Sequence, residues 1–374
     1  MEKESQKKKK RILHGLSEVA GQNSYSVQGL RYWGEKAECV IYYRNPFQYP
    51  FDICLNIKQG NKKAYPWYAL KMLFFLVKAL FRYRIFHFHY GRSILVNYEL
   101  PLYSLLGKKV FYEFHGSDLR DYSRLADSRG ALLFQKEKPS RSLKKRNDKI
   151  ARRAQGIILH DDELIPFLPE GHAPVNVVPL RVDISRFTPS YPRAETERIR
   201  IVHAPSHRGV KGSEYVLKAF EELNKRYDNI EFVLVEGKTQ EEAFKLYQTA
   251  DIVVDQLLIG TYGVFAIECM AMGKPVITYI KDEMRDKLPG ELPIVSADIH
   301  TIGEVLEQLI RDGTLRREKG IAGRKYAEDY HDNRFGAGVL RDIYYGRAEA
   351  LTGREAFARV KRIKEAETAE KDGR

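Results

Sequence analysis

Short apolar runs alternate along most of the chain with longer stretches in which apolar residues recur at helical spacing. Apolar runs of a few residues, bounded by turn residues, are typical of buried parallel strands, and the stretches between them are typical of covering helices. The pattern therefore predicts an α/β fold built from βαβ units. The predicted strands lie at 12–16, 40–43, 53–55, 85–89, 110–114, 156–160, 176–180, 201–202, 232–235, 252–254 and 276–280.

The pattern breaks between 183 and 198, where prolines and charged residues replace the periodic apolar positions. A chain of 374 residues is long enough for two domains with separate cores. We predict a first domain over 1–185, a second over 198–335, and a C-terminal helical segment over 336–374. Charged helices are expected at 324–332 and 334–367.

A basic turn follows the strand at 201–202, with Arg208, Lys211 and Gly212 before a predicted helix that Ser213 is placed to cap. Backbone amides at the start of a helix favour an anion, and two cations would add charge-assisted hydrogen bonds. The turn is thus a candidate phosphate site. A solvated basic loop gives the same pattern and stays open as an alternative.

Histidines stand at the ends of two predicted strands. His87 and His89 share one face of their strand, which fits half of a metal site but is more typical of two hydrogen-bonded histidines. The next strand delivers His115, followed by a glycine, a serine and Asp118, a polar group suited to a substrate rich in hydroxyls. Asp118 could instead be no more than a helix cap.

Three further stretches each have two interpretations. The aromatic and basic helix predicted at 67–84 fits a core helix packed on the sheet, which we favour, or a helix that touches anionic lipid. Gly21, after the first strand, would let a ligand approach the backbone or is simply a turn residue, the commoner case. The carboxylates at 161–163 fit a cation site or, more simply, a helix N-terminus.

The composition limits the partners and the compartment. A net charge of +13 and a pI near 9.3 favour an anionic partner, but the basic stretch 119–154 lacks the aromatic interleaving of a nucleic-acid platform. Three cysteines without a pairing or metal-ligand pattern favour a reducing compartment. No signal peptide or bilayer-spanning segment is recognised, so we expect a cytoplasmic protein, free or peripheral to the inner face of a membrane.

Taken together, the motifs resemble the GT-B fold glycosyltransferases, specifically the retaining group 1 glycosyl transferases. The resemblance spans most of the chain, and its most specific segment runs from Glu268 to Val276, similar to the family's Glu-Ala-Met-Ala-x-Gly-x-Pro-Val. Further matches are His87-Phe88-His89-Tyr90, Phe114-His115-Gly116-Ser117-Asp118, the hinge from Val178 to Phe187, Arg208 with Lys211-Gly212, and Ala250-Asp251-Ile252.

The resemblance implies two Rossmann-like domains facing a cleft, with the C-terminal helices packing back on the N-terminal domain. It implies transfer of a hexose, with retention, from a nucleotide-sugar donor to a glycan or lipid-linked acceptor in cell-surface polysaccharide or glycoconjugate synthesis. The nucleotide sugar is then a co-substrate, and neither a cofactor nor a metal is needed. Anionic membrane is a further expected partner, and nucleic acid is not.

The same resemblance assigns the site residues. His115 would contact the donor sugar, Arg208 and Lys211 would stabilise the departing diphosphate, and Gly21 would admit the donor phosphates. The helix end at Gly263 and Val264 would add to the anion site. Glu268 would accept hydrogen bonds from the nucleotide ribose.

Two departures from the family pattern keep alternatives open. The family commonly carries two glutamates with seven residues between them, and Gly260 occupies the first position, beside Thr261 and Tyr262. The family's usual arginine also lies further before the lysine than Arg208 does. A non-catalytic sugar-nucleotide-binding relative therefore remains a hypothesis, as does a metal-dependent hydrolase that uses His87, His89, His115 and Asp118.

Overall fold

The computed structural model describes residues 11–44, 47–57, 60–121 and 141–373. The basic run 7–10 and the segment 122–140 of the charged stretch lie outside these residues. Two compact units are present: unit 1 contains the described residues up to Arg120, 141–181 and 333–373, and unit 2 contains Val182–Asp332. The helical segment predicted from residue 336 thus begins at Asn333 and belongs to unit 1.

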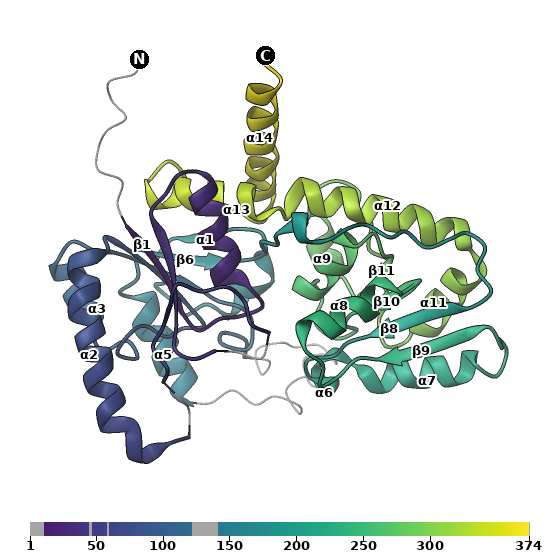
Figure 1. Ribbon diagram of the computed structural model, residues 1–374, viewed down its shortest axis with the longest axis horizontal. Helices are drawn as coiled ribbons and strands as arrows, with labels where there is room; N and C mark the ends of the chain where they lie inside the picture. The colour runs from purple at the N-terminus through teal and green to yellow at the C-terminus, as the bar shows by residue number, and fades with distance from the viewer. Residues whose placement is uncertain (1–10, 45–46, 58–59, 122–140, 374) are drawn as a thin grey trace. The chain divides into compact units, whose positions relative to one another are not determined.

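Unit 1 is built on a parallel sheet of seven strands in the order β3-β2-β1-β4-β5-β6-β7 (Figure 1). The predicted strands of the first half are confirmed to within a few residues, because each is a short apolar run buried between helices. The strands are β1 (Ile12–Leu16), β2 (Ala37–Ile41), β3 (Ile53–Cys54), β4 (Ile85–His89), β5 (Lys109–Glu113), β6 (Gly156–Leu159) and β7 (Val175–Val177).

The C-terminal helices of the chain return to unit 1, as expected. α13 lies along α1, so closely that a Cβ on Gly29 would overlap the backbone of Asn333, and Trp33 Nε1 donates to the carbonyl of Arg334 at 2.6 Å. One helix was predicted at 334–367, but the chain leaves α13 near Gly346, which has φ 70°, and α14 follows. The helices of unit 1 are α1 (Gln22–Tyr32), α2 (Tyr65–Arg82), α3 (Leu100–Leu105), α5 (Arg141–Ala151), α13 (Asn333–Tyr344) and α14 (Gly353–Lys371), with 3₁₀ turns at Lys62–Ala64 and Asp162–Phe167.

The favoured interpretation of α2 as a core helix is wrong. Only Leu76 and Ala79 among its residues are buried, while most of its aromatic side chains face solvent. The sequence pattern misled because the helix is apolar on more of its circumference than the underlying sheet can cover. No described helix, α2 included, carries a stretch apolar enough to cross a bilayer.

Unit 2 contains a parallel sheet of four strands in the order β11-β10-β8-β9. Its strands are β8 (Ile199–His203), β9 (Ile230–Leu234), β10 (Ile252–Val254) and β11 (Val276–Ile277), the last shorter than predicted. Its helices are α6 (Arg208–Lys211), α7 (Ser213–Leu223), α8 (Gln240–Gln248), α9 (Val264–Ala271), α10 (Asp282–Arg285), α11 (Ile302–Arg311) and α12 (Gly313–Tyr330), with a 3₁₀ turn at Ile184–Arg186.

Two predicted caps have different outcomes. Ser213 does not cap α7: Gly212 stands at the cap with φ 75°, and the Ser213 hydroxyl lies 2.8 Å from His203 Nε2 instead. Asp161 does cap a helix, because it accepts a hydrogen bond from the backbone N–H of Glu163. The simpler interpretation of the carboxylates at 161–163, a helix N-terminus, is therefore confirmed.

Candidate functional site

Both sheets have a point at which the strand order reverses, where open parallel sheets bind ligands at the carboxyl ends of the strands. In unit 1 this point lies between β1 and β4, and in unit 2 between β8 and β10. The predicted site residues follow these strands or their neighbours. Gly21 and His115 lie in unit 1, and Arg208, Lys211, Gly263, Val264 and Glu268 lie in unit 2.

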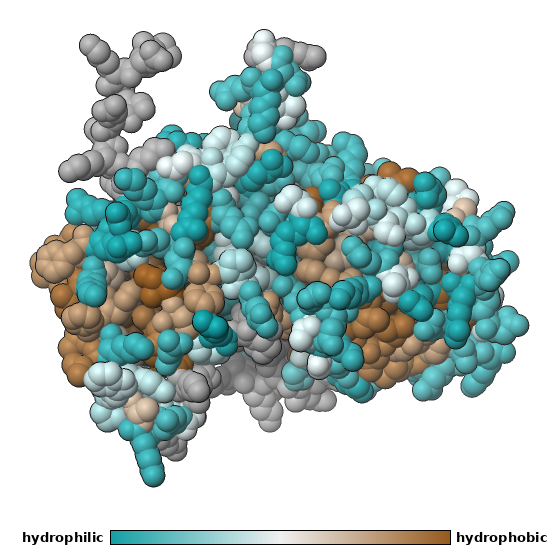
Figure 2. Space-filling view, in the orientation of Figure 1, coloured by the Kyte–Doolittle hydropathy of each residue, from teal (hydrophilic) through white to brown (hydrophobic). Residues whose placement is uncertain are grey.

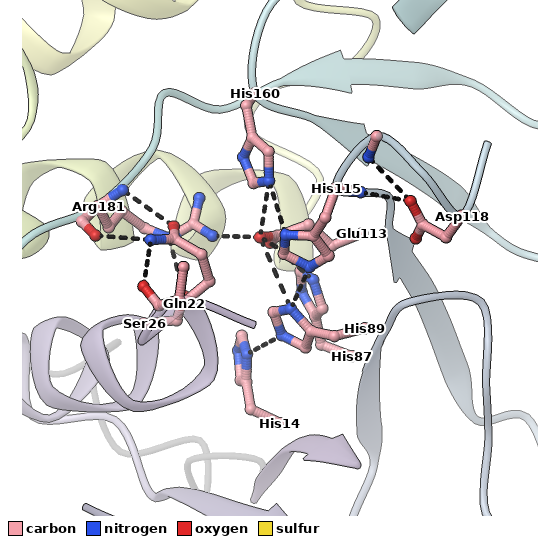
Figure 3. A network of polar contacts seen from close by, with 12 residues as sticks. His14, Gln22, Ser26, His87, His89, Glu113, His115, Asp118, His160 and Arg181 are labelled. Atoms are coloured by element: carbon pink, nitrogen blue, oxygen red, sulfur yellow. Dashed lines mark hydrogen bonds and ion pairs between the residues drawn. The ribbon is translucent and has the colours of Figure 1, made fainter. Parts of the chain in front are cut away.

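A cluster of five histidines occupies the reversal point of unit 1 (Figure 3). His14 on β1 and His87 on β4 are register partners, and their rings stack with centroids 4.4 Å apart. His89 lies two residues further along β4, and His115 and His160 follow β5 and β6. The parallel register of four strands thus gathers imidazoles that the sequence separates by up to 146 positions.

A buried ion pair stands beside the histidines. Arg181 Nη2 lies 2.5 Å from Glu113 Oε1, and both side chains are fully buried. Burial alone would raise the pKa of Glu113, but the guanidinium of Arg181 holds that pKa well below its usual range. Burial lowers the pKa of all five histidines, so they are neutral at pH 7. The carboxylate is therefore the fixed anion of the cluster.

The histidines form a continuous hydrogen-bonded chain. Its contacts are His160 Nε2 to His115 Nδ1 at 3.0 Å, His115 Nε2 to His89 Nδ1 at 3.1 Å, and His89 Nε2 to His14 Nδ1 at 3.2 Å. The Tyr344 hydroxyl continues it, 2.9 Å from His14 Nε2 and 2.5 Å from His87 Nδ1. His87 Nε2 lies 3.0 Å from Glu113 Oε2, an electrostatic contact that lacks hydrogen-bond geometry.

The ionised carboxylate decides the direction of this chain. A neutral imidazole has one donor and one acceptor, so a proton on His87 Nε2 facing Glu113 requires Tyr344 to donate to His87. Each later ring must then carry its proton on Nε2. Both ring nitrogens of His115 are consequently engaged, one donating to His89 and one accepting from His160. A ligand that binds the His115 ring must exchange one of these partners.

The loop after His115 is held by Asp118. Asp118 Oδ1 accepts hydrogen bonds from the backbone N–H groups of His115 and Gly116, at 2.9 and 2.8 Å. Ser117 Oγ lies 2.9 Å from the Tyr90 hydroxyl, at an exposed position. The loop therefore presents Ser117 and Tyr90 at the surface of unit 1, while the buried Asp118 fixes the loop backbone.

Two groups in this cluster have ligand atoms close enough for a metal ion: His14 with His87 and His89, and His89 with Glu113 and His115. The structure thus brings together the three histidines of the hydrolase hypothesis. In the second group a metal would have to share Glu113 with the Arg181 guanidinium, which already neutralises that carboxylate. This second donor set therefore fits a metal in number but not in charge.

Gly21 has φ 80°, in the left-handed region that favours glycine. The space that a Cβ would occupy there is filled by the rings of Tyr25 and Tyr49, at 2.5 and 2.8 Å, and not left open for a ligand. Burial raises the pKa of the nearby Glu18 to about 8, while the backbone amides of Ser24, Asn23 and Gly21 oppose that rise. These amides at the start of α1 therefore already face a carboxyl group of the chain.

The predicted cations of unit 2 lie on α6 and have carboxylate partners. Arg208 is exposed and pairs with Glu236 at 2.5 Å. Lys211 Nζ lies 2.7 Å from Asp255 Oδ1 and 2.8 Å from Gln256 Oε1, which places it across the reversal point between β8 and β10. An anion that binds here would take over cations that are now held by Glu236 and Asp255.

The N-terminus of α9 is open. Gly263 stands at its cap, no described side chain caps the helix, and a Cβ on Gly263 would meet no described atom within 4 Å. The first helical residue is Val264. One turn further, Glu268 is buried, and its Oε1 has no hydrogen-bond partner among the described residues. Burial raises the pKa of Glu268 to about 8, and the charge of Arg186 opposes that rise.

Gly260, at the position of the family's first glutamate, is covered by Lys281. A Cβ on Gly260 would overlap the side-chain carbons of Lys281, and the Lys281 backbone N–H donates to the Gly260 carbonyl at 2.9 Å. The Tyr262 hydroxyl lies 3.0 Å from His331 Nε2 and is buried. A lysine stem therefore occupies the space next to the missing carboxylate.

Known proteins resemble this chain in structure but not in sequence. No protein-family model matches the chain, and the curated protein sequences give no match either. Sucrose-phosphate synthase from Thermosynechococcus elongatus is similar in structure, with a TM-score of 0.64 and 16% identity over 90% of this chain and 99% of the other. Anabaena HepE, solved in complex with UDP, gives 0.58 and 10% over 90% and 100%.

The chain has the GT-B fold. UDP-GlcNAc 2-epimerase from Neisseria meningitidis, bound to UDP-GlcNAc, is a more distant GT-B neighbour, with a TM-score of 0.51 and 14% identity over 90% of this chain and all of the other. The fold predicted from the motifs is confirmed. Because the GT-B fold hosts both transferases and epimerases in these neighbours, it does not by itself choose the reaction.

Five members of the unit 1 cluster were not predicted as site residues: His14, Glu113, His160, Arg181 and Tyr344. For two of them, the sequence contained a feature that could have identified them. Glu113 is the one charged residue of the predicted strand 110–114, and His160 ends the predicted strand 156–160 much as His115 follows the earlier one. The other three join the cluster only through the tertiary fold: His14 through strand order, Tyr344 through the return of α13, and Arg181 through its ion pair with Glu113.

Proposed function

We propose that the protein is a glycosyltransferase that moves a hexose from a nucleotide-sugar donor to a glycan or lipid-linked acceptor, with retention at the sugar carbon. The proposed setting is cell-surface polysaccharide or glycoconjugate synthesis at the cytoplasmic face of an anionic membrane. The GT-B fold supports this proposal, as do three cysteines without a disulfide. Neighbours crystallised with UDP and UDP-glucose favour a uridine nucleotide.

The observation that carries the proposal is the buried carboxyl group of Glu268. Its Oε1 has no hydrogen-bond partner in the described part of the chain, and it stands one turn behind the N-terminus of α9. A buried acceptor without a partner is unfavourable by about 1–3 kcal/mol. Two vicinal ribose hydroxyls would satisfy it. A diphosphate attached to that ribose would lie toward the helix N-terminus and Lys211.

The proposed chemistry uses the charges of unit 2. Cleavage of the bond between the sugar and the diphosphate places a negative charge on the departing phosphate oxygen. The amides at Gly263 and Val264, with Lys211 and Arg208, stabilise that charge as it develops. His115 in unit 1 contacts the sugar by releasing His160 or His89. No cofactor takes part in this scheme.

Thermal unfolding with UDP, GDP and ADP tests donor binding. We expect a rise in the melting temperature with at least one of these nucleotides, and loss of that rise in Lys211→Ala. Lys245→Ala is the matched control, because Lys245 also pairs with a carboxylate in unit 2 but lies exposed on α8. A melting temperature unchanged by all three nucleotides would refute the proposal.

Pooled nucleotide sugars incubated with candidate acceptors then test the reaction. Release of free nucleotide only with acceptor, and an α- or β-linkage that matches the donor anomer, is the expected result for a retaining transferase. Epimerised donor formed without acceptor would instead indicate the epimerase chemistry of the neighbouring fold. Nucleotide binding without turnover would favour the non-catalytic relative, and activity lost with a chelator would favour the hydrolase.

A further inference from the structure

One face of α2 in unit 1 is apolar and exposed. Five large side chains on it recur at steps of three and four residues, which places them on one side of the helix. Their exposed fractions are 64% for Trp67, 57% for Leu70, 62% for Phe74, 47% for Val77 and 89% for Phe81. Leu73, 49% exposed, widens the stripe. We call these six residues the α2 face.

The α2 face is large for a surface that stays in water. Fully buried aromatic side chains contribute roughly 150–250 Å² each, so three exposed aromatics and three aliphatics offer several hundred Å² of apolar area. The opposite side of the helix, through Leu76 and Ala79, already packs on unit 1. Figure 2 shows brown surface over the region of α2 and α3, interrupted by teal side chains. Such a surface marks an interaction site.

The charges that α2 itself carries have one sign: they are Lys71, Lys78 and Arg82, of which Arg82 pairs with Glu38 of β2. Residues 53–98 contain no Asp or Glu, and their basic residues are Lys58, Lys62, Lys63, Lys71, Lys78, Arg82, Arg84 and Arg92. Lys78 reaches back so that its Nζ lies 4.6 Å from the centroid of the Phe74 ring. Long basic side chains beside an apolar stripe can place their charges at lipid headgroups while the stripe enters the acyl region.

The same charges argue against a second copy of α2 as the occupant. The spacing of Trp67, Leu70, Phe74, Val77 and Phe81 also fits a coiled-coil seam, in which flanking positions carry opposite charges that pair across the interface. Here Lys71 and Lys78 flank the seam, and α2 has no carboxylate to offer them. Two copies would bring lysines together, whereas an anionic bilayer attracts each of them by about 1 kcal/mol.

We propose that α2 docks on an anionic lipid bilayer, with the α2 face in the interface and its lysines at the headgroups. This inference deepens the proposed function, since a lipid-linked acceptor would be met at that surface. It does not depend on catalysis, because lipid binding is measured without substrate. No segment crosses the bilayer in this arrangement: the helix lies in the plane of the interface.

Co-sedimentation with vesicles tests the proposal. We expect the full-length protein to bind vesicles of phosphatidylcholine with phosphatidylglycerol, to bind pure phosphatidylcholine at least tenfold more weakly, and to lose affinity as salt rises. Phe74→Glu/Phe81→Glu should weaken binding to the anionic vesicles at least tenfold. Ile321→Glu, at an apolar side chain 45% exposed on α12 of unit 2, is the matched control and should bind like the wild type.

Three results would overturn the inference. The first is no vesicle binding by the wild type, and the second is wild-type affinity in Phe74→Glu/Phe81→Glu, as binding through the basic run 7–10 alone would give. The third is a lipid-free dimer in sedimentation velocity that the same double substitution dissociates. Since both substituted residues are exposed, the variant should keep the melting temperature and nucleotide response of the wild type. If no nucleotide raises the melting temperature of the wild type, the proposed function is refuted. The vesicle-binding result remains valid in that case, because it is measured without nucleotide.

Discussion

Replacing Glu268 by glutamine should change how the stability of the protein depends on pH. The folded pKa of Glu268 is raised to about 8 by burial, against 4.5 for the exposed group. Between these values the folded protein holds a proton on Glu268 that the unfolded chain has lost. The wild type therefore gains stability from Glu268 below pH 4.5, and this stability is lost as pH rises toward 8. Glutamine cannot ionise and should not show this loss.

The magnitude follows from the two pKa values. One pKa unit corresponds to about 1.4 kcal/mol, and the folded group begins to ionise near the upper end of the range. From pH 5.5 to pH 7.5 the wild type should lose about 2 to 3 kcal/mol of unfolding free energy relative to Glu268→Gln. Urea denaturation of both proteins at several pH values measures this difference, in which contributions from the histidine cluster cancel.

If the difference in unfolding free energy between the wild type and Glu268→Gln stays constant from pH 5.5 to 7.5, Glu268 is ionised in the folded protein. That result would refute its placement in an apolar, unpaired environment. Nucleotide binding gives an independent check. If ribose hydroxyls donate to the carboxylate, binding lowers the pKa of Glu268, and UDP affinity should rise with pH by up to about tenfold per unit. The pH dependence that remains in Glu268→Gln reports on the nucleotide itself and serves as the baseline.

Two further substitutions test the packing around the site. Arg181→Met should destabilise unit 1 by about 3–5 kcal/mol, because it leaves the Glu113 carboxylate buried and unpaired. Adding Glu113→Gln should recover part of that loss, as measured by urea denaturation. Equal stability of the single and double variants would contradict the ion pair. Gly260→Ala should destabilise unit 2 by about 1–3 kcal/mol, because its Cβ overlaps the Lys281 stem. In a double-mutant cycle, Lys281→Ala should relieve most of this effect, and additive effects would show that Lys281 does not fill the space.

Much of the fold followed from local patterns. β4, with residues Ile85–His89, matches its predicted bounds, and β10, with residues Ile252–Val254, does so too. Such strands are predictable because a short apolar run between turn residues can be satisfied only inside a covered sheet. α2 shows the limit of this reasoning: its bounds were close, but which side of it would be covered depends on the sheet beneath.

The candidate site divides in the same way. The sequence order predicted that Lys211, Gly263 and Glu268 follow particular strands, and parallel strands bring their carboxyl ends to one edge of the sheet. The residues that contact them could not be predicted. Asp255 holds Lys211 because β8 and β10 are neighbours, and that adjacency is a property of strand order in the sheet.

The sequence by itself determined that this protein is an α/β chain of two parallel sheets, with a basic turn and an acidic helix residue at the ends of strands in the second. Only the tertiary structure decided that His115 lies within a chain of neutral imidazoles, between His160 and His89, directed by one buried carboxylate. Hydrophobic periodicity is a local property that each segment carries alone. Hydrogen-bond direction and pKa depend on burial and on neighbours such as Arg181 and Tyr344, which come from other strands and from the returning α13.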